Sequence, residues 1–238
     1  MSGDILALTV RSVQISFMQT VLFDLDGTLI DHFSAIHSSI AYAQKALGLP
    51  ESSYETVKAT VGGSLPVTMG KLIGTEKVEA ALPHFHDHFN RVMLKDVAIL
   101  PGAEWLLETL HANGMQLAVF TNKYGEHARA VLEHLKLDRF LTLTLGAEDC
   151  PYRKPEPEFT QYIMDQLKAD PQNTCLIGDS PFDAAAADVG NLPSYLVATG
   201  SHTHEALISG TPAVEVYQNL FELGAGVFNL DIPLIAHG

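Results

Sequence analysis

Cysteine is scarce in this sequence. Cys150 and Cys175 are the only two among 238 residues, and they form neither a CxxC pair nor a recognisable metal-ligand spacing. Two separate thiols exclude a disulfide-stabilised scaffold and favour a reduced protein, so the expected location is the cytoplasm. The first seventeen residues also lack the basic start and apolar run of a signal peptide.

Positive charge is scarce as well. The chain has 14 Lys and Arg against 28 Asp and Glu, which gives a formal net charge of −14. Because nucleic acids and anionic membranes are bound by clustered basic side chains, the composition argues against both as partners. No apolar run approaches the length of a transmembrane helix. Any phosphate bound here must be small and met by a local cation or a metal ion.

Apolar residues, by contrast, make up 47% of the chain, enough for one large core. Short apolar runs of the kind that form buried strands recur along the sequence, at 20–24, 116–122, 142–149, 174–179 and 195–200. Helical patterns at 125–136, 155–169 and 180–190 separate the later runs. This alternation predicts a Rossmann-like α/β core, in which a parallel sheet is flanked by helices.

The chain between the first two predicted strands is too long for a simple connection. Residues 31–98 contain several helical patterns and no convincing strand. We therefore predict an N-terminal extension at 1–18, an α/β core formed by 19–31 and 98–238, and an inserted helical cap at 32–97. After Gly200 one further helix is predicted within 216–224.

Polar residues follow the predicted strands at the ends where ligands bind in open α/β sheets. They are Asp24 and Asp26 after the first strand, Thr121 and Asn122 after the second, Lys154 near the third, and Asp179 and Asp183 after the fourth. Converging carboxylates repel one another unless a cation lies between them, and Mg²⁺ prefers such oxygen ligands together with a substrate phosphate. The pattern predicts a Mg²⁺ site that handles phosphate. Two carboxylates one residue apart could then divide nucleophilic attack and proton transfer between them.

Four short motifs resemble, in order, those of the haloacid dehalogenase superfamily. They are "DLDGTL" at 24–29, "VFTN" at 119–122, the lysine of "RKPEPE" at 153–158, and "GDSPFD" at 178–183. With the helical insert after the first motif, the chain is similar to members that carry a four-helix cap, notably phosphoglycolate-phosphatase-like enzymes. The resemblance covers about residues 19–200.

This resemblance implies a role for each matching position. Asp24 would be the nucleophile that forms an aspartyl phosphate, and Asp26 would protonate the leaving oxygen and then activate water. Thr121 and the backbone of Asn122 would bind the transferring phosphoryl group. Lys154 would neutralise charge on Asp24 and on the phosphate.

The resemblance also implies the ligands of the metal. Mg²⁺ would bind Asp24, the main-chain carbonyl of Asp26 and Asp179, while Asp183 would orient bound water without binding the metal directly. The expected activity is hydrolysis of small, soluble phosphate monoesters, such as phosphoglycolate or sugar phosphates, by a monomer or homodimer.

Other interpretations of the same residues stay open. A dehalogenase would need neither the metal nor Asp26, whose presence argues against it. A phosphosugar mutase would keep both aspartates and return the phosphoryl group to a sugar, and a non-catalytic protein on this fold would bind a phosphometabolite without releasing phosphate. Taken singly, the "DLDG" segment could be a turn, and Asp179 and Asp183 could simply cap a helix.

Substrate selection is expected from the cap. The candidates are His32, His37, the loop "VGGSLP" at 61–66, and Lys71, although each could be purely structural. The histidine-rich segment at 84–89 has two phenylalanines one helical turn apart. An amphipathic helix with Phe inward and His outward explains it better than a metal site does.

Overall fold

The computed structural model describes residues 18–233, so most of the predicted N-terminal extension lies outside the described residues. Within this range the chain forms a six-stranded parallel sheet in the order β5-β4-β1-β6-β7-β8. The strands are β1 (Thr20–Phe23), β4 (Gln116–Tyr124), β5 (Leu143–Ala147), β6 (Thr174–Gly178), β7 (Ser194–Val197) and β8 (Glu215–Tyr217). The predicted Rossmann-like core is confirmed.

The strands at the centre of the sheet are buried on both faces. Every residue of β1 and of β6 is buried, as expected for near-continuous apolar strands in a parallel sheet. Side chains alternate between the two faces, since Val21 and Phe23 join one apolar cluster and Leu22 joins another.

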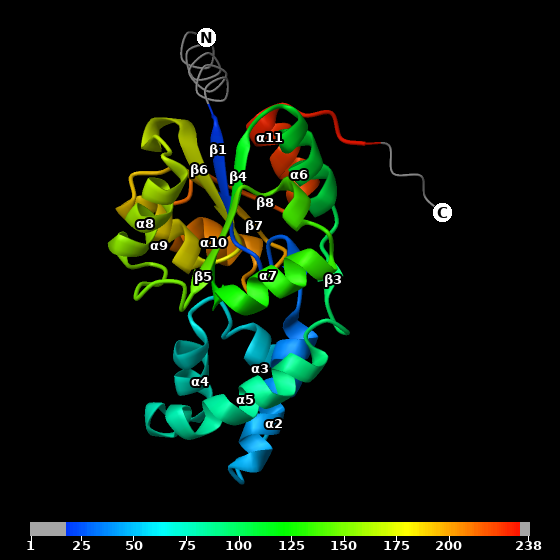
Figure 1. Ribbon diagram of the computed structural model, residues 1–238, viewed down its shortest axis with the longest axis vertical. Helices are drawn as coiled ribbons and strands as arrows, with labels where there is room; N and C mark the ends of the chain where they lie inside the picture. Colours follow the sequence, from blue (N-terminus) through cyan, green and yellow to red (C-terminus); the bar gives the residue numbers. More distant parts are fainter. Residues whose placement is uncertain (1–17, 234–238) are drawn as a thin grey trace.

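Helices cover both of these faces (Figure 1). One apolar cluster is completed by α6 (Ala103–Ala112), α7 (Gly125–His134) and α11 (Leu220–Phe228). The other is completed by α8 (Pro157–Leu167) and α9 (Pro181–Val189). The carboxyl ends of the strands are thereby left as the edge of the sheet at which polar residues can gather.

A helical insertion between β1 and β4 lies beyond this edge (Figure 1). It consists of α2 (Phe33–Ala46), α3 (Tyr54–Lys58), α4 (Leu65–Ile73) and α5 (Val78–Val92). These helices share an apolar core of their own. The chain enters and leaves the insertion through a short antiparallel pair, β2 (Ile30–Asp31) and β3 (Ala98–Ile99). The predicted helical insertion is confirmed, and the domain boundaries at 32 and 97 stay a prediction.

The cap helix α5 packs much as its sequence predicts. Phe85 and Phe89 are buried and face inward. The histidines are half-buried rather than fully outward, because His86 stacks on Tyr124 of the core at 4.9 Å between ring centroids, and His88 stacks on Tyr42 at the same separation. The helix therefore uses its histidines as packing surfaces.

The end of the chain departs from the prediction of a helix within 216–224. Val216 lies in β8 instead, where it pairs with Leu196 of β7. The helix α11 begins only at Leu220, after Asn219 accepts hydrogen bonds from the backbone of Phe221 and Glu222. Pairing with the exposed edge of β7 outweighs the helical pattern over the first residues. A further short helix, α10 (His204–Gly210), connects β7 to β8.

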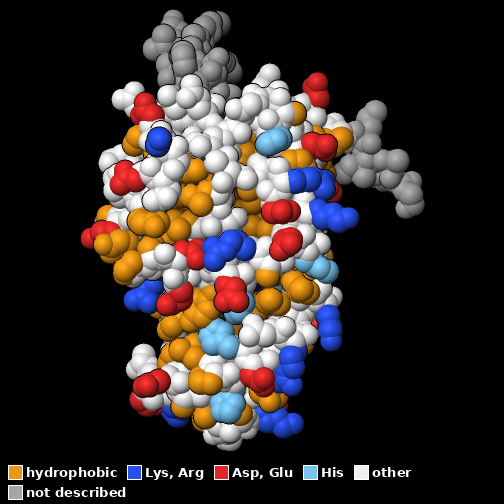
Figure 2. All heavy atoms as spheres, viewed as in Figure 1, with side chains coloured by type: hydrophobic (Ala, Val, Ile, Leu, Met, Phe, Trp, Pro, Cys, Tyr) orange, Lys and Arg blue, Asp and Glu red, His pale blue; other side chains and the backbone are white. Residues whose placement is uncertain are grey.

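The surface where cap and core meet carries hydrophobic and histidine side chains (Figure 2). Among the helices of residues 18–233, none is both long and apolar enough to cross a membrane.

Candidate active site

Lys154 is the centre of a buried ion-pair network. Its ammonium donates hydrogen bonds to Asp24 Oδ1 at 2.7 Å, to Asp183 Oδ1 at 2.6 Å and to the carbonyl of Phe120 at 2.8 Å. The side chain of Lys154 has no exposed surface. Burial alone would lower the pKa of Lys154, but Asp183 and Asp24 raise it above its usual value. The lysine is therefore charged and directly beside the predicted nucleophile.

Asp24 is fixed by the sheet. It follows β1, its backbone N–H donates to the carbonyl of Ile177 on β6 at 2.8 Å, and its residue is 8% exposed. The side chain is therefore almost completely buried at the carboxyl end of a central strand. Asp24 thus has the fixed position that a nucleophile needs.

Asp183 has both oxygens engaged. While Oδ1 accepts from Lys154, Oδ2 accepts from the hydroxyl of Ser180 at 2.6 Å, from its backbone N–H at 3.0 Å and from the N–H of Asp179 at 3.3 Å. Ser180 and Asp183 together form the capping box that starts α9. The first-turn role considered for Asp183 from the sequence is therefore real and coexists with its contact to Lys154, whereas the N-cap of α9 is Ser180 and not Asp179.

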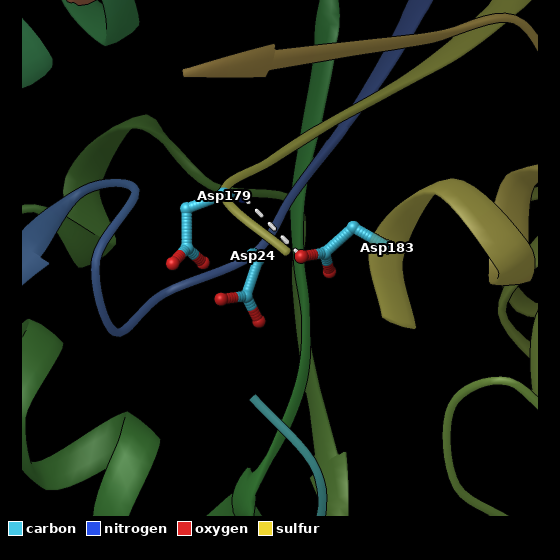
Figure 3. Close-up of side chains that lie close together, drawn as sticks. All are labelled: Asp24, Asp179 and Asp183. Atoms are coloured by element: carbon cyan, nitrogen blue, oxygen red, sulfur yellow. Dashed lines mark hydrogen bonds between the residues drawn. The ribbon is translucent and has the colours of Figure 1, made fainter. Parts of the chain in front are cut away.

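Three carboxylates meet at this point, one from the segment after β1 and two from the segment where β6 leads into α9 (Figure 3). Oxygens of Asp24, Asp179 and Asp183 lie within 4.8 Å of one another, and all three residues are buried. Burial raises the pKa of Asp24 to about 6, although Lys154 opposes the shift, and burial together with the charges of Asp183 and Asp24 raises the pKa of Asp179 well above its usual value. One lysine cannot compensate three buried carboxylates, so the oxygen set fits a divalent cation.

Glycine is required where the first motif approaches Asp179. Gly27 has a φ of +88°, and a Cβ there would lie 2.7 Å from Asp179 Oδ2 and 2.8 Å from Gly200 Cα. The hydroxyl of Thr199 donates to the carbonyl of Gly27 at 2.7 Å, and the N–H of Ser201 donates to Asp179 Oδ2 at 3.0 Å. These contacts hold the two loops close together around the carboxylate.

Asp26 is paired with a cation of its own. Lys123 Nζ donates to Asp26 Oδ2 at 2.9 Å and to Oδ1 at 3.1 Å, and His32 Nδ1 lies 3.6 Å from Oδ1. Burial alone would raise the pKa of Asp26, but Lys123 and His32 together lower it below its usual value. Lys123 was not predicted from the sequence, although it directly follows the predicted Thr121 and Asn122 at the end of β4.

Asn122 braces the site and reaches the cap. Its Oδ1 accepts from the backbone N–H of Lys154 at 2.8 Å, and its Nδ2 donates to the carbonyls of Lys154 at 3.1 Å and Gly62 at 3.2 Å. Thr121 is 2% exposed, and its hydroxyl oxygen accepts from the N–H of Lys123 at 3.2 Å. The hydroxyl hydrogen of Thr121 can therefore be donated to a ligand.

The predicted cap candidates divide into two groups. His32 and His37 have ring nitrogens within hydrogen-bond distance of backbone carbonyls, at 2.8 Å from Met93 and 3.0 Å from Ser52. Both histidines therefore hold the cap together. Lys71 projects toward the core, with its ammonium 5.7 Å from the centroid of the Phe182 ring.

The loop at 61–66 helps to enclose a cavity between cap and core. The space measures about 490 Å³, including its open mouth, and lies beside Asp26. Its walls are mainly apolar or aromatic and come from both parts of the chain: Asp26, Ile36, Val61, Gly63, Leu65, Thr68, Phe85, Phe89, Asn122, Lys123, Tyr124 and His127. A small molecule bound at Asp24 would have this cavity as its neighbour.

The family model for haloacid dehalogenase-like hydrolases matches residues 21–197, which span the seven predicted site residues from Asp24 to Asp183. The chain belongs to this family. As a haloacid dehalogenase-like hydrolase it is an enzyme, and the resemblance read from the four motifs is confirmed.

Relatives of this hydrolase match most of its length. A protein of Dickeya dadantii named "Probable phosphatase IndB" is 33% identical over 82% of the chain and 88% of its own length. Phosphoglycolate phosphatase 1 of Pseudomonas aeruginosa is 27% identical over 85% of the chain and 77% of its own length.

Solved structures share the fold. A predicted phosphatase from Clostridium acetobutylicum superimposes with a TM-score of 0.83 at 26% identity, covering 90% of this chain and 100% of its own. A haloacid dehalogenase-like hydrolase from Bacteroides fragilis gives a TM-score of 0.82 at 24% identity, over 87% and 99% of the two chains. The core and the helical insertion are therefore a shared architecture.

Proposed function

We propose that this hydrolase is a Mg²⁺-dependent phosphatase that cleaves small phosphate monoesters through an aspartyl phosphate on Asp24. The observation that supports the proposal best is the separation of the two aspartates of "DLDG". Asp24 is held by Lys154, whereas Asp26 is held by Lys123, so two carboxylates separated by a single residue lie in different electrostatic environments. Different environments suit different chemical roles.

In the first half-reaction, an Asp24 oxygen attacks phosphorus and the bond between phosphorus and the ester oxygen breaks. Lys154 neutralises negative charge on the phosphoryl group, and Thr121 binds that group. Asp26 gives its proton to the departing oxygen. In the second half-reaction, water attacks phosphorus, Asp26 takes the proton, and the bond from phosphorus to Asp24 breaks. Phosphate leaves and both aspartates return to their starting state.

Lys123 gives Asp26 a way to change its affinity for protons. In the structure its ammonium keeps Asp26 ionised. A phosphate dianion arriving between Asp24 and Asp26 competes for the same ammonium. Once that contact weakens, the pKa of Asp26 rises, and Asp26 takes from solvent the proton that it then donates to the leaving oxygen.

The metal would be held by the carboxylates of Asp24 and Asp179 and by the main-chain carbonyl of Asp26. Asp183 would keep its hydrogen bonds to Lys154 and Ser180 and would orient the water bound to the metal. When bound, Mg²⁺ supplies positive charge that stabilises the phosphoryl oxygens in the transition state. Burial and the neighbouring carboxylates disfavour the ionised form of Asp179, and a divalent cation at this place would compensate its charge.

The names of the relatives suggest phosphoglycolate as one substrate to test, and sugar phosphates are a second. The acidic composition and the two separate cysteines support a cytoplasmic enzyme that acts on a small metabolite.

The proposal is tested by measuring inorganic phosphate released from a panel of monoesters with Mg²⁺. The wild type should release phosphate, Asp24→Asn should not, and Asp26→Asn should lose on the order of a hundredfold or more in turnover. Excess EDTA should abolish release. The exposed Asp87, which pairs with Arg91 on the cap surface, provides a matched control as Asp87→Asn, with activity unchanged.

Release by Asp24→Asn at the wild-type rate would refute the nucleophile, and full activity in EDTA would refute the metal. Transfer of the phosphoryl group to an added sugar phosphate instead of water would show a mutase. Binding of the esters with no release would show a non-catalytic protein.

A further inference from the structure

The cavity beside Asp26 is where the organic part of a substrate would lie. It continues from the side of Asp26 that faces the cap, and Asn122 on its wall also touches Lys154. A phosphorus atom attacked by Asp24, with its leaving oxygen next to Asp26, directs the attached group into this cavity. Its walls therefore determine which esters fit.

The walls of the cavity are apolar and aromatic. Ile36, Val61 and Leu65 contribute aliphatic surface from the cap. Phe85 and Phe89 lie 5.2 Å apart between ring centroids with planes inclined by 15°, so two nearly parallel rings form one wall. Such walls favour burial of an apolar or ring-bearing group.

The charged side chains on the wall neutralise each other. Asp26 and Lys123 form a direct ion pair at 2.9 Å. His127 is a third titratable group, and burial, followed by the charge of Lys123, lowers its pKa to about 4. His127 is therefore neutral near pH 7. Among the described residues that line the cavity, none offers a cation without a carboxylate partner.

Lys71 is the cap lysine that the sequence offers as a candidate for substrate selection. It does not line this cavity. Its ammonium lies over Phe182 of α9. The ammonium of Lys154, in the neighbouring site, is itself taken up by Asp24 and Asp183. A second anionic group on the substrate would meet no free cation here.

From these observations we infer that the preferred substrate carries an uncharged, largely apolar or aromatic organic group, and that a carboxylate on that group is selected against. The inference rests on the proposed phosphatase function and narrows its substrate class. It separates this enzyme from a phosphatase specific for phosphoglycolate, because the carboxylate of that substrate would enter an apolar cavity without a partner.

The test compares esters that differ by one carboxylate. Phenyl phosphate is paired with 4-carboxyphenyl phosphate, and methyl phosphate is paired with phosphoglycolate. In each pair kcat/KM should be on the order of a hundredfold lower for the carboxylate, since an ionised carboxylate loses water there without gaining a partner. Equal or higher kcat/KM for the carboxylate esters would overturn the inference.

A variant of the wall tests whether this cavity causes the preference. Leu65 is only partly buried, so Leu65→Lys can place an ammonium at the cavity while Leu65→Met keeps a neutral side chain of similar size. The lysine variant should reduce the discrimination between paired esters at least about tenfold relative to the methionine variant, by providing the missing cation. An unchanged ratio would contradict the assignment.

Lys71→Met provides a second test that leaves the buried wall intact, because Lys71 is exposed. The inference predicts the same ratio of kcat/KM as in the wild type. A selective loss of activity toward the carboxylate esters would show that Lys71 binds them and would overturn the inference. Failure of the whole proposed function is recognised separately, since no ester would then be hydrolysed faster by the wild type than by Asp24→Asn.

Discussion

Replacing Lys154 with methionine should destabilise the folded protein strongly, and more at high pH than at low pH. Methionine keeps much of the length and apolar volume of lysine, so the main change is loss of the ammonium. That ammonium donates hydrogen bonds to Asp24, Asp183 and the carbonyl of Phe120. Its removal leaves two buried carboxylates without their shared cation.

The expected loss follows from this geometry. Removing one partner of a buried ion pair typically costs about 3–5 kcal/mol, because the remaining charge is left uncompensated. Lys154 has no exposed surface, and its side chain satisfies two carboxylates rather than one. We therefore expect the free energy of unfolding at pH 8, without metal, to fall by about 3–5 kcal/mol.

The dependence on pH comes from Asp24. Burial already raises the pKa of Asp24 from 3.8 to about 6 in the presence of Lys154, and without the lysine it should rise further. At pH values between the pKa of Asp24 in the folded wild type and its higher pKa in the folded variant, Asp24 binds a proton in the variant but not in the wild type. The stability of the variant relative to the wild type therefore falls as pH rises through that range. Near pH 5 Asp24 is protonated in both proteins, so its share of the difference disappears.

The assay is urea unfolding of both proteins in EDTA at pH 5 and pH 8, with Lys95→Met as a control at an exposed cap position. The control should unfold like the wild type at both pH values. A loss for Lys154→Met below about 1 kcal/mol, or an equal loss at both pH values, would refute the buried network as described.

Three further predictions concern other parts of the site. Gly27→Ala should weaken Mg²⁺ binding by at least about tenfold in a calorimetric titration, because the added Cβ would press on Asp179 and the backbone has a φ of +88°; unchanged affinity would contradict the close approach. Lys123→Met should lower the free energy of unfolding at pH 7, where the lowered pKa of Asp26 contributes its full stability, and the difference from the wild type should shrink only as pH falls below about 3.8 toward the folded value; equal unfolding midpoints at pH 7 would contradict the ion pair. Cys175 should resist a thiol reagent at pH 8 in the folded protein while the half-buried Cys150 reacts, because burial raises the pKa of Cys175 to about 12; rapid modification of both thiols would disprove its burial.

Much of the site could be predicted from the sequence because parallel strands bring their carboxyl ends together. Asp24, Asn122 and Asp179 each follow a buried apolar run, and this alone places them at one edge of the sheet. The contact of Lys154 with Asp24 was predicted from the motif. The structure gives this contact a length of 2.7 Å, while the catalytic roles of these residues stay predictions.

The features that were missed depend on contacts between segments far apart in the sequence. Lys123 reaches Asp26 only because β4 continues beyond Asn122, and a single lysine after a strand has no distinguishing pattern. The cavity wall combines Leu65 and Phe85 of the cap with Tyr124 of the core. No local periodicity shows which cap side chains will meet the core. Strand β8 was missed for a similar reason, since its three residues gain their structure from pairing with β7.

The central claim is that Asp24 carries the phosphoryl group during turnover. The most direct test is to mix the Mg²⁺-loaded enzyme with phenyl phosphate labelled at phosphorus, quench in acid within milliseconds, and map the label on peptides. The account predicts label on the peptide that contains Asp24, released by mild alkali and absent from Asp24→Asn. Phosphate release at full rate with no label on this peptide, or with label on another residue, would contradict it.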